Sequence, residues 1–165
     1  MKRQDVLEAA LALDTPLVEL TGGEPLLQPG VFHLLRELCD AGKTVLVETS
    51  GEADVAHVDR RVHKIMDLKA PGSSESHRNR WSNLEHITER DEIKFVLSNR
   101  NDYEWMRKII DDYGLASRTP HLLASTVFGK LAAKDVVAWV VDDKLPLRVQ
   151  LQLHKYIWEP TATGV

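Results

Sequence analysis

Short apolar segments alternate with helical segments along nearly the whole chain, and this alternation limits the possible folds more than any other feature. Parallel strands need a crossover connection, which a helix supplies, so the pattern predicts an α/β fold with a parallel sheet. The helices are predicted from apolar residues three and four positions apart, and the strands from short apolar or β-branched runs. The predicted strands span residues 17–20, 44–48, 62–68, 92–97, 121–125 and 148–153, and the predicted helices span 4–13, 31–41, 79–87 and 133–142, with another around Met106, Ile109, Ile110 and Tyr113.

Two arrangements of such units remain open, a doubly wound sheet and an incomplete barrel of the TIM type. The periodicity of the sequence does not distinguish them. In both arrangements, ligands bind at the carboxyl ends of the strands. The residues at those ends are therefore the ones to examine for chemistry.

Composition excludes collagen-like, mucin-like and disordered classes of protein. The 165 residues are 43% hydrophobic and 28% charged, with 9 Gly and 7 Pro, which is typical of one globular domain over residues 1–165. The net charge is −4 and the basic residues are scattered, so nucleic acid is not an expected partner. No apolar run approaches the roughly 18 residues of a membrane span, and the first residues lack the pattern of a secretory signal. We therefore expect a cytoplasmic protein that does not use a membrane.

Polar residues follow several of the predicted strands at the point where each strand ends. They are Thr21, Gly22, Gly23 and Glu24; Glu48, Thr49 and Ser50; Asp67 and Lys69; and Ser125 and Thr126. The two glycines suit a plain turn as well as a loop that a ligand approaches closely. Their loop is neither a Gly-x-Gly-x-x-Gly dinucleotide motif nor a phosphate-binding loop with its lysine. Because the ends of parallel strands meet at one edge, these residues predict a shared polar pocket.

Other chemically reactive residues have less specific surroundings. The seven histidines show no zinc-binding spacing. Cys39 is the single cysteine, which excludes an internal disulfide and any Cys-x-x-Cys motif. Its place beside Leu38 on a predicted helix favours a small buried thiol over a nucleophile. The run Arg78-Asn79-Arg80 suits an anion site, although a solvated loop is the stronger interpretation.

The loop Thr21-Gly22-Gly23-Glu24-Pro25 resembles the Gly-Gly-Glu-Pro motif of radical S-adenosylmethionine enzymes. Later segments, in the same order and spacing, resemble the 7-carboxy-7-deazaguanine synthase family of the queuosine pathway. These segments are residues 47–51, 66–73, 91–96, 127–129 and 150–158. The last of them is the most specific, and the resemblance extends over essentially all 165 residues.

This resemblance implies an incomplete TIM-like (βα) barrel, a homodimer, and S-adenosylmethionine bound across the strand ends. Thr21 would contact the substrate, and Gly23 and Glu24 would meet the methionine amino group. The full set of implied cofactor contacts is Gly22, Gly23, Glu24, Glu48, Ser50, Asp67, Leu68 and Lys69, with Ser125, Thr126, Val127 and Phe128 around the adenosine. The implied reaction is that of a carbon–nitrogen lyase, which contracts 6-carboxy-5,6,7,8-tetrahydropterin to 7-carboxy-7-deazaguanine. The family also uses Mg²⁺ and a four-iron four-sulfur cluster.

The chain departs from the family pattern near its start. The family holds its cluster with Cys-x3-Cys-x2-Cys before the Gly-Gly-Glu-Pro strand and places the Mg²⁺ residue just after it, whereas Cys39 follows that motif and is alone. One thiolate cannot replace three. Residues 1–13 match the helix that follows the cluster loop. We therefore expect an N-terminally truncated barrel without its first strand, cluster loop or metal ligands, and an inactive chain. The alternatives are a glycyl-radical-enzyme activase and a cluster-free binding or assembly module.

The cysteine count generates a first prediction, that the 165-residue chain binds no iron–sulfur cluster. Anaerobic reconstitution with iron and sulfide, followed by an assay of both elements, measures it. The Cys39→Ala variant is the control and should retain the same low iron content. A stoichiometric four-iron cluster that supports cleavage of S-adenosylmethionine would contradict the prediction.

Overall fold

The computed structural model describes residues 2–162. Within these residues, six strands form one sheet, and every neighbouring pair of strands is parallel. The strands are β1 (Leu17–Leu20), β2 (Thr44–Thr49), β3 (His63–Leu68), β4 (Glu92–Leu97), β5 (Leu122–Thr126) and β6 (Arg148–Val149). The α-helices are α1 (Arg3–Ala12), α2 (Val31–Asp40), α3 (Arg100–Asp112), α4 (Leu115–Arg118), α5 (Ala133–Asp142) and α6 (His154–Ile157). Short 3₁₀ helices are η1 (Pro25–Leu27), η2 (Pro71–Ser73), η3 (Ser76–Arg78) and η4 (Trp81–His86).

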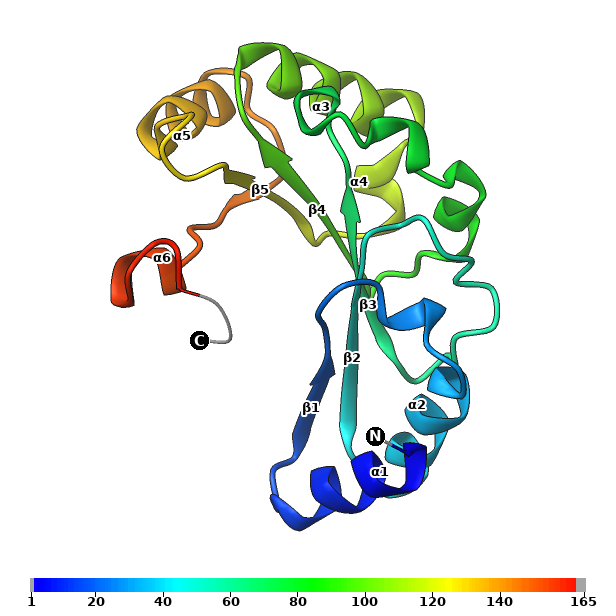
Figure 1. Ribbon diagram of the computed structural model, residues 1–165. Coiled ribbons are helices and arrows are strands. Elements are labelled where there is room, and N and C mark those ends of the chain that lie inside the picture. The colour runs from blue at the N-terminus through cyan, green and yellow to red at the C-terminus, as the bar shows by residue number, and fades with distance from the viewer. Residues whose placement is uncertain (1, 163–165) are drawn as a thin grey trace.

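The order of the strands decides between the two predicted architectures. A doubly wound sheet reverses its strand order at a switch point and carries helices on both faces. Here the order runs from β1 to β6 without reversal, and α1, α2, α3 and α5 lie on the outer side of a curved sheet (Figure 1). The fold is an incomplete TIM-like barrel, and the α/β prediction is confirmed.

Strand residues alternate between the helix-covered side of the sheet and its inner side. In β2, β3 and β4, each buried residue on the helix side is followed by a less buried one on the inner side. The buried residues form one hydrophobic core with α2 and α3, which includes Leu35, Leu38, Val45, Val47, Met66, Phe95, Met106 and Leu122. Parallel sheets usually bury both faces. In this sheet the inner face instead carries charged residues, because no helix covers it.

The structure differs from the predicted elements at three places. Within residues 79–87, Trp81–His86 form the 3₁₀ helix η4 instead of an α-helix, and α4 is not predicted. The last strand, predicted over residues 148–153, is reduced to Arg148–Val149 and is followed by α6. Only β5 pairs with β6, and the last bond between their backbones runs from the Gln150 N–H to the Ala124 carbonyl at 2.8 Å. A strand with one neighbour has no second ladder of hydrogen bonds to extend it.

Cys39 is half-buried, so the prediction of a buried thiol is only partly correct. The buried residues of α2 are Val31, Leu34, Leu35 and Leu38, and Cys39 lies beside this apolar stripe. Burial raises the pKa of the Cys39 thiol above its ordinary value, which favours the protonated form.

None of the helices in residues 2–162 has both the length and the apolar character to cross a bilayer.

A buried ion pair ties β3 to the start of β4 at the amino end of the sheet. Lys64 Nζ lies 2.9 Å from Asp91 Oδ2, and the two side chains are 6% and 1% exposed. Asp91 also accepts hydrogen bonds from the Lys64 N–H at 2.8 Å and from the Thr88 N–H and hydroxyl at 2.8 and 2.9 Å. The buried carboxylate is therefore fully paired.

The Lys64→Met substitution should lower the free energy of unfolding by about 3 kcal/mol, because it leaves the Asp91 charge buried without its cation. Urea denaturation measures the change. The control is Lys108→Met, which removes an exposed pair with Asp112 on α3 and should leave the unfolding midpoint nearly unchanged. Equal losses in the two variants would contradict the prediction.

Candidate functional site

The ends of the first three strands form one polar hollow, as the parallel register requires. The hollow has a volume of about 210 Å³ and is lined by Thr21, Gly22, Gly23, Glu48, Ser50, Asp67 and Lys69. A neighbouring hollow of about 320 Å³ shares Gly23, Ser50 and Lys69 with it and adds Glu24, Leu27, Glu52, Glu75 and Arg78. Most of the predicted cofactor contacts on β1, β2 and β3 therefore lie together.

Gly22 and Gly23 adopt backbone conformations that other residues rarely adopt. Their φ angles are +89° and +54°. Within the described residues, a Cβ atom built on either glycine would meet no heavy atom within 4 Å. Glycine is therefore favoured at both positions by the positive φ angle and not by a lack of space for a side chain. The backbone of this loop faces open space. The turn is therefore present, and the close approach of a ligand to this loop stays a prediction.

Glu24 joins the loops that follow β1 and β2. Its Oε2 accepts hydrogen bonds from the Thr49 hydroxyl at 2.8 Å, the Ser50 N–H at 2.7 Å and the Ser50 hydroxyl at 2.6 Å. Its Oε1 accepts one from the Leu26 N–H at 3.1 Å, at the start of η1. The side chain is therefore mostly committed to the protein, and Oε1 is the oxygen with the fewer donors. A contact with a ligand's ammonium stays a prediction.

Glu48 lies on the inner face of the sheet between Thr21 and Lys94. Its Oε2 accepts from the Thr21 hydroxyl at 2.9 Å, and its Oε1 lies 2.8 Å from Lys94 Nζ. Burial by itself raises the pKa of Glu48, but the hydrogen bond and charge of Lys94, with the Thr21 bond, outweigh it and lower the pKa below 4.5. The neighbouring Glu19 has a raised pKa, because of burial first and the Glu48 charge second. Glu48 is thus held as a carboxylate.

Two buried polar atoms near this edge have no partner among the described residues. Asp67 Oδ2 lies 2.7 Å from Lys69 Nζ, but Asp67 Oδ1 is unpaired. Ser125, which is 2% exposed, has an unpaired hydroxyl oxygen. Buried polar atoms normally have hydrogen-bond partners, so both atoms are unsatisfied within the described residues. Leu68 is fully buried in the core, which leaves only its backbone for a contact with a ligand.

The segment after β5 lines a different hollow. Thr126 and Phe128 contribute to a space of about 510 Å³ that also includes Lys130 and Tyr156. The Phe128 and Tyr156 rings meet edge to face, with their centroids 5.7 Å apart. Val127 is held by its N–H, which donates to the Leu97 carbonyl at 2.8 Å. The four predicted segments share one edge of the sheet, but the structure does not bring the β5 segment into the hollow of the other three.

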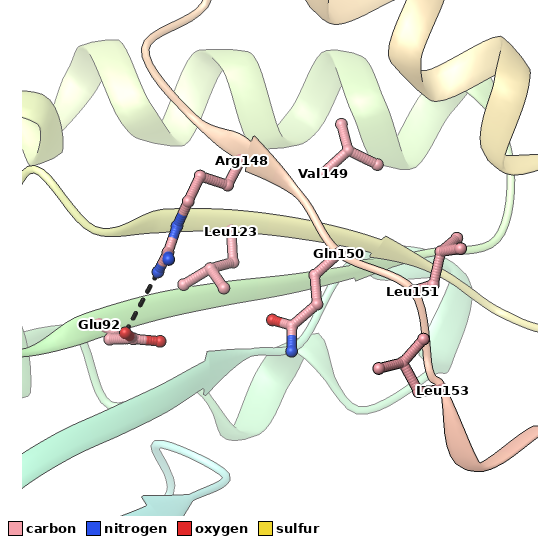
Figure 2. A pocket seen from close by; sticks show the side chains of 7 residues that line it. All are labelled: Glu92, Leu123, Arg148, Val149, Gln150, Leu151 and Leu153. Atoms are coloured by element: carbon pink, nitrogen blue, oxygen red, sulfur yellow. Dashed lines mark hydrogen bonds and ion pairs between the residues drawn. The ribbon is translucent and has the colours of Figure 1, made fainter.

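A groove of about 510 Å³ runs along the inner face beside β6. It is lined by Glu92, Leu123, Arg148, Val149, Gln150, Leu151 and Leu153. Figure 2 shows Arg148 reaching past Leu123 to Glu92, at an N–O distance of 3.2 Å, while Gln150 projects beside them. Leu123 pairs in register with Lys94, and Glu92 lies on the same strand as Lys94, so the groove borders the Glu48–Lys94 pair. The sequence pattern did not predict it.

One further residue of the site, Lys94, was missed by sequence reasoning, and it bonds to Glu48. Thr49, which the sequence places among the polar strand-end residues, is buried and bonds to Glu24. Lys94 lies between the buried residues Ile93 and Phe95, so its side chain is on the opposite, inner face of β4. This alternation of apolar and charged residues in the sequence could have predicted that Lys94 is on the inner face.

Metal centres do not fit the side chains of the described residues. In residues 2–162, no group of three or more His, Cys, Asp or Glu side chains is arranged to hold a metal ion. A four-iron four-sulfur cluster needs several thiolates, and Cys39 on α2 is the single cysteine of the sequence. Residues 2–162 therefore lack the thiolates of the cluster site, and no multi-ligand group of side chains in them marks an Mg²⁺ site.

Comparison with curated proteins identifies the family. The chain is 44% identical over its whole length to the 7-carboxy-7-deazaguanine synthase of Chlorobaculum tepidum, of which it covers 76%. It is 41% identical to the enzyme of the same name from Koribacter versatilis and 34% identical to that of Clostridium acetobutylicum, covering 72% and 76% of those proteins. The chain belongs to the 7-carboxy-7-deazaguanine synthase family. No protein-family model matches this family member.

Solved structures support the fold of this 7-carboxy-7-deazaguanine synthase family member. Streptococcus suis SuiB, in a crystal structure with S-adenosylmethionine, superposes with a TM-score of 0.65 at 13% identity. The match covers 92% of this chain but 42% of SuiB. Another SuiB structure gives a TM-score of 0.64 at 12% identity, over all of this chain and 48% of SuiB. This chain therefore spans less than half of those proteins.

Replacing Lys94 by Met should raise the pKa of Glu48, because burial remains while the compensating cation is lost. The carboxyl carbon resonance of Glu48, followed by NMR during a pH titration, measures this. Since the folded pKa is lowered, Glu48 stabilises the native state above pH 4.5, and this contribution is lost as the pH falls through the folded pKa. Acid destabilisation should therefore be weaker in Lys94→Met.

The matched control is Lys43→Met, since Lys43 Nζ bonds to the Thr15 carbonyl at the opposite end of the sheet. Its Glu48 titration should coincide with that of the unsubstituted protein. An unchanged Glu48 pKa in Lys94→Met would show that Lys94 does not hold the charge of Glu48.

Proposed function

We propose that residues 1–165 bind S-adenosylmethionine and a pterin substrate for the reaction of 7-carboxy-7-deazaguanine synthase, a radical S-adenosylmethionine lyase. The observation that carries the proposal is the polar hollow at the ends of β1, β2 and β3, with its ionised Glu48 and the unpaired Asp67 Oδ1. In parallel α/β barrels this edge is where ligands bind. Membership of the family supports the same function.

S-adenosylmethionine fits the chemistry of the residues at this edge. Asp67 Oδ1 and Glu24 Oε1 accept the protons of its ammonium or ribose hydroxyls, and the open backbone at Gly22 and Gly23 allows close approach. Ser50 and Lys69 line the space between, and the Leu68 backbone contributes beside them. In this proposal the adenosine extends along the edge toward residues 125–128, of which Thr126 and Phe128 line a separate hollow. The chemistry that the bound cofactor supplies in this enzyme class is hydrogen-atom abstraction.

The inner face suits a flat, polar substrate such as 6-carboxy-5,6,7,8-tetrahydropterin. Thr21 and Glu48 face it from the strand ends, and Glu48 accepts hydrogen bonds from ring N–H groups. The groove beside β6 adds the guanidinium of Arg148, the amide of Gln150 and an apolar wall at Leu123. The charge balance of −4 supports a small-molecule substrate over nucleic acid.

The proposal includes a homodimer in the cytoplasm. The exposed apolar side chains of Leu153, Ile157 and Trp158 suit contact with a second copy. No step is assigned to an iron–sulfur cluster or to Mg²⁺, because the donor set does not fit them. In this proposal, residues 1–165 therefore bind the ligands. The reduction of S-adenosylmethionine that starts radical chemistry requires groups that these residues do not supply. The single cysteine also favours a second candidate, a cluster-free binding module.

Isothermal titration with S-adenosylmethionine tests the proposal. We expect a dissociation constant weaker than about 1 μM, because the backbone contacts are present but the iron that chelates the methionine group is not. The Asp67→Asn variant should bind about tenfold more weakly, because it loses a charged acceptor. The control, Asp54→Asn, alters an exposed residue paired with Arg80 and should bind normally.

Absence of binding by the unsubstituted chain would overturn the proposed function. A dissociation constant in the nanomolar range would contradict the weak binding expected without the chelating iron. Binding of S-adenosylmethionine without binding of 6-carboxy-5,6,7,8-tetrahydropterin would favour the binding module over the synthase.

A further inference from the structure

The connection between β3 and β4 contains two buried asparagines. The crossovers from β1 to β2, from β4 to β5 and from β5 to β6 contain an α-helix, whereas this one contains only the 3₁₀ helices η2, η3 and η4. Asn79 is 7% exposed and Asn83 is 0% exposed. Arg78 and Arg80 are solvated and form ion pairs with Glu52 and Asp54, as expected of a polar loop. Asn79 lies between these two arginines but is buried, so the interpretation of residues 78–80 as a solvated loop is wrong for Asn79.

Asn79 forms two hydrogen bonds with the backbone of a single residue, Lys69. The Lys69 N–H donates to Asn79 Oδ1 at 2.9 Å, and Asn79 Nδ2 donates to the Lys69 carbonyl at 2.9 Å. These are the same two backbone groups that a neighbouring strand would bind. Lys69 is the first residue after β3, where the ladder ends, so Asn79 fixes the chain at the position from which the Lys69 side chain reaches Asp67.

Asn83 does the same for the loop after β2. Its Nδ2 donates to the Gly51 carbonyl at 3.1 Å and to the Ala53 carbonyl at 2.7 Å, and its Oδ1 accepts from the Val55 N–H at 3.3 Å. Gly51 also accepts from the Arg80 N–H at 3.1 Å. Gly51 directly follows Ser50, whose N–H and hydroxyl bond to Glu24.

The asparagine side chain meets the demands of both places. Each place needs a donor and an acceptor on one short side chain, which an amide supplies and which Asp, lacking the donor, does not. Removing the amide leaves buried backbone groups without partners, and such groups are costly. A fully paired polar network also selects one conformation of the loops that it joins. Both loops held in this way line the candidate cofactor hollow.

We propose that Asn79 and Asn83 are positioning residues for cofactor binding, which act by fixing the backbone at Lys69 and Gly51. This inference rests on the proposed function, because it assigns to the two loops the role of contacting S-adenosylmethionine. Neither asparagine contacts the ligand itself. Their effect on affinity arises from the order they impose on Lys69, Asp67 and Ser50 before binding.

The experiment compares Asn79→Leu, which has nearly the same size but no amide, with Thr119→Val. Thr119 is also buried, and its hydroxyl donates to the Asp91 carbonyl at 2.6 Å, at the opposite end of the sheet. Three quantities are measured for each variant: the unfolding midpoint, the exchange rate of the Lys69 amide proton by NMR, and the affinity for S-adenosylhomocysteine. This unreactive analogue of the cofactor avoids turnover.

We expect both variants to lose stability, but only Asn79→Leu to exchange the Lys69 amide faster and to bind the analogue about tenfold more weakly, because a misplaced contact loses much of its value. Where Asn79→Leu fails to fold, Asn79→Asp takes its place. The carboxylate keeps an acceptor for the Lys69 N–H but repels the Lys69 carbonyl, so amide protection should persist while affinity falls.

The outcomes separate this inference from the proposed function. Normal affinity in Asn79→Leu, or in Asn79→Asp where that variant is used, overturns the inference and leaves the proposed function standing. So does an equal loss of affinity in Thr119→Val, which would show that general stability is responsible. Failure of the unsubstituted chain to bind the analogue would instead overturn the proposed function, and the inference with it.

Discussion

Parallel pairing of every strand is the constraint on which the rest of this structure depends. It sends all the strand ends to one edge, so polar residues separated by more than a hundred positions, such as Thr21 and Ser125, share that edge. It also requires long crossovers, whose helices bury the outer face around Phe95 and Met66. The inner face is left free for charged groups, and the Glu48–Lys94 pair occupies it.

The edge itself is ordered by side chains that replace missing backbone partners. A strand stops donating and accepting where its neighbour ends, so each loop beyond it needs other hydrogen bonds. Glu24 provides them between the first two loops, Asn83 for the second and Asn79 for the third. Asp102 joins the loops after β3 and β4 in the same way. Its carboxylate accepts hydrogen bonds from the Gly72 N–H in the first of these loops and from the Ser98 N–H and hydroxyl in the second. The site is therefore held by buried polar groups on a rigid sheet.

Much of the fold was predictable because its signals are local. The apolar stripe of α2 and the β-branched run of β2 determine their own conformations, and the predicted and observed bounds agree closely. Residues 79–87 were misassigned because their conformation depends on distant partners. Their apolar spacing suits a helix, but Asn79 and Asn83 are bound to Lys69, Gly51 and Ala53. Likewise, β6 is shorter than predicted because only Arg148 and Val149 pair with β5.

By itself, the sequence determined the alternation of strands and helices, the polar strand ends, and the presence of a single cysteine. These follow from residue identity and spacing, which are complete without coordinates. Tertiary structure decided which polar groups meet: that Glu24 is bound to Ser50 while Asp67 Oδ1 stays unpaired, and that Lys94 holds the charge of Glu48. Those pairings depend on register and sheet curvature, which bring together residues that are far apart in sequence, and no local pattern records them.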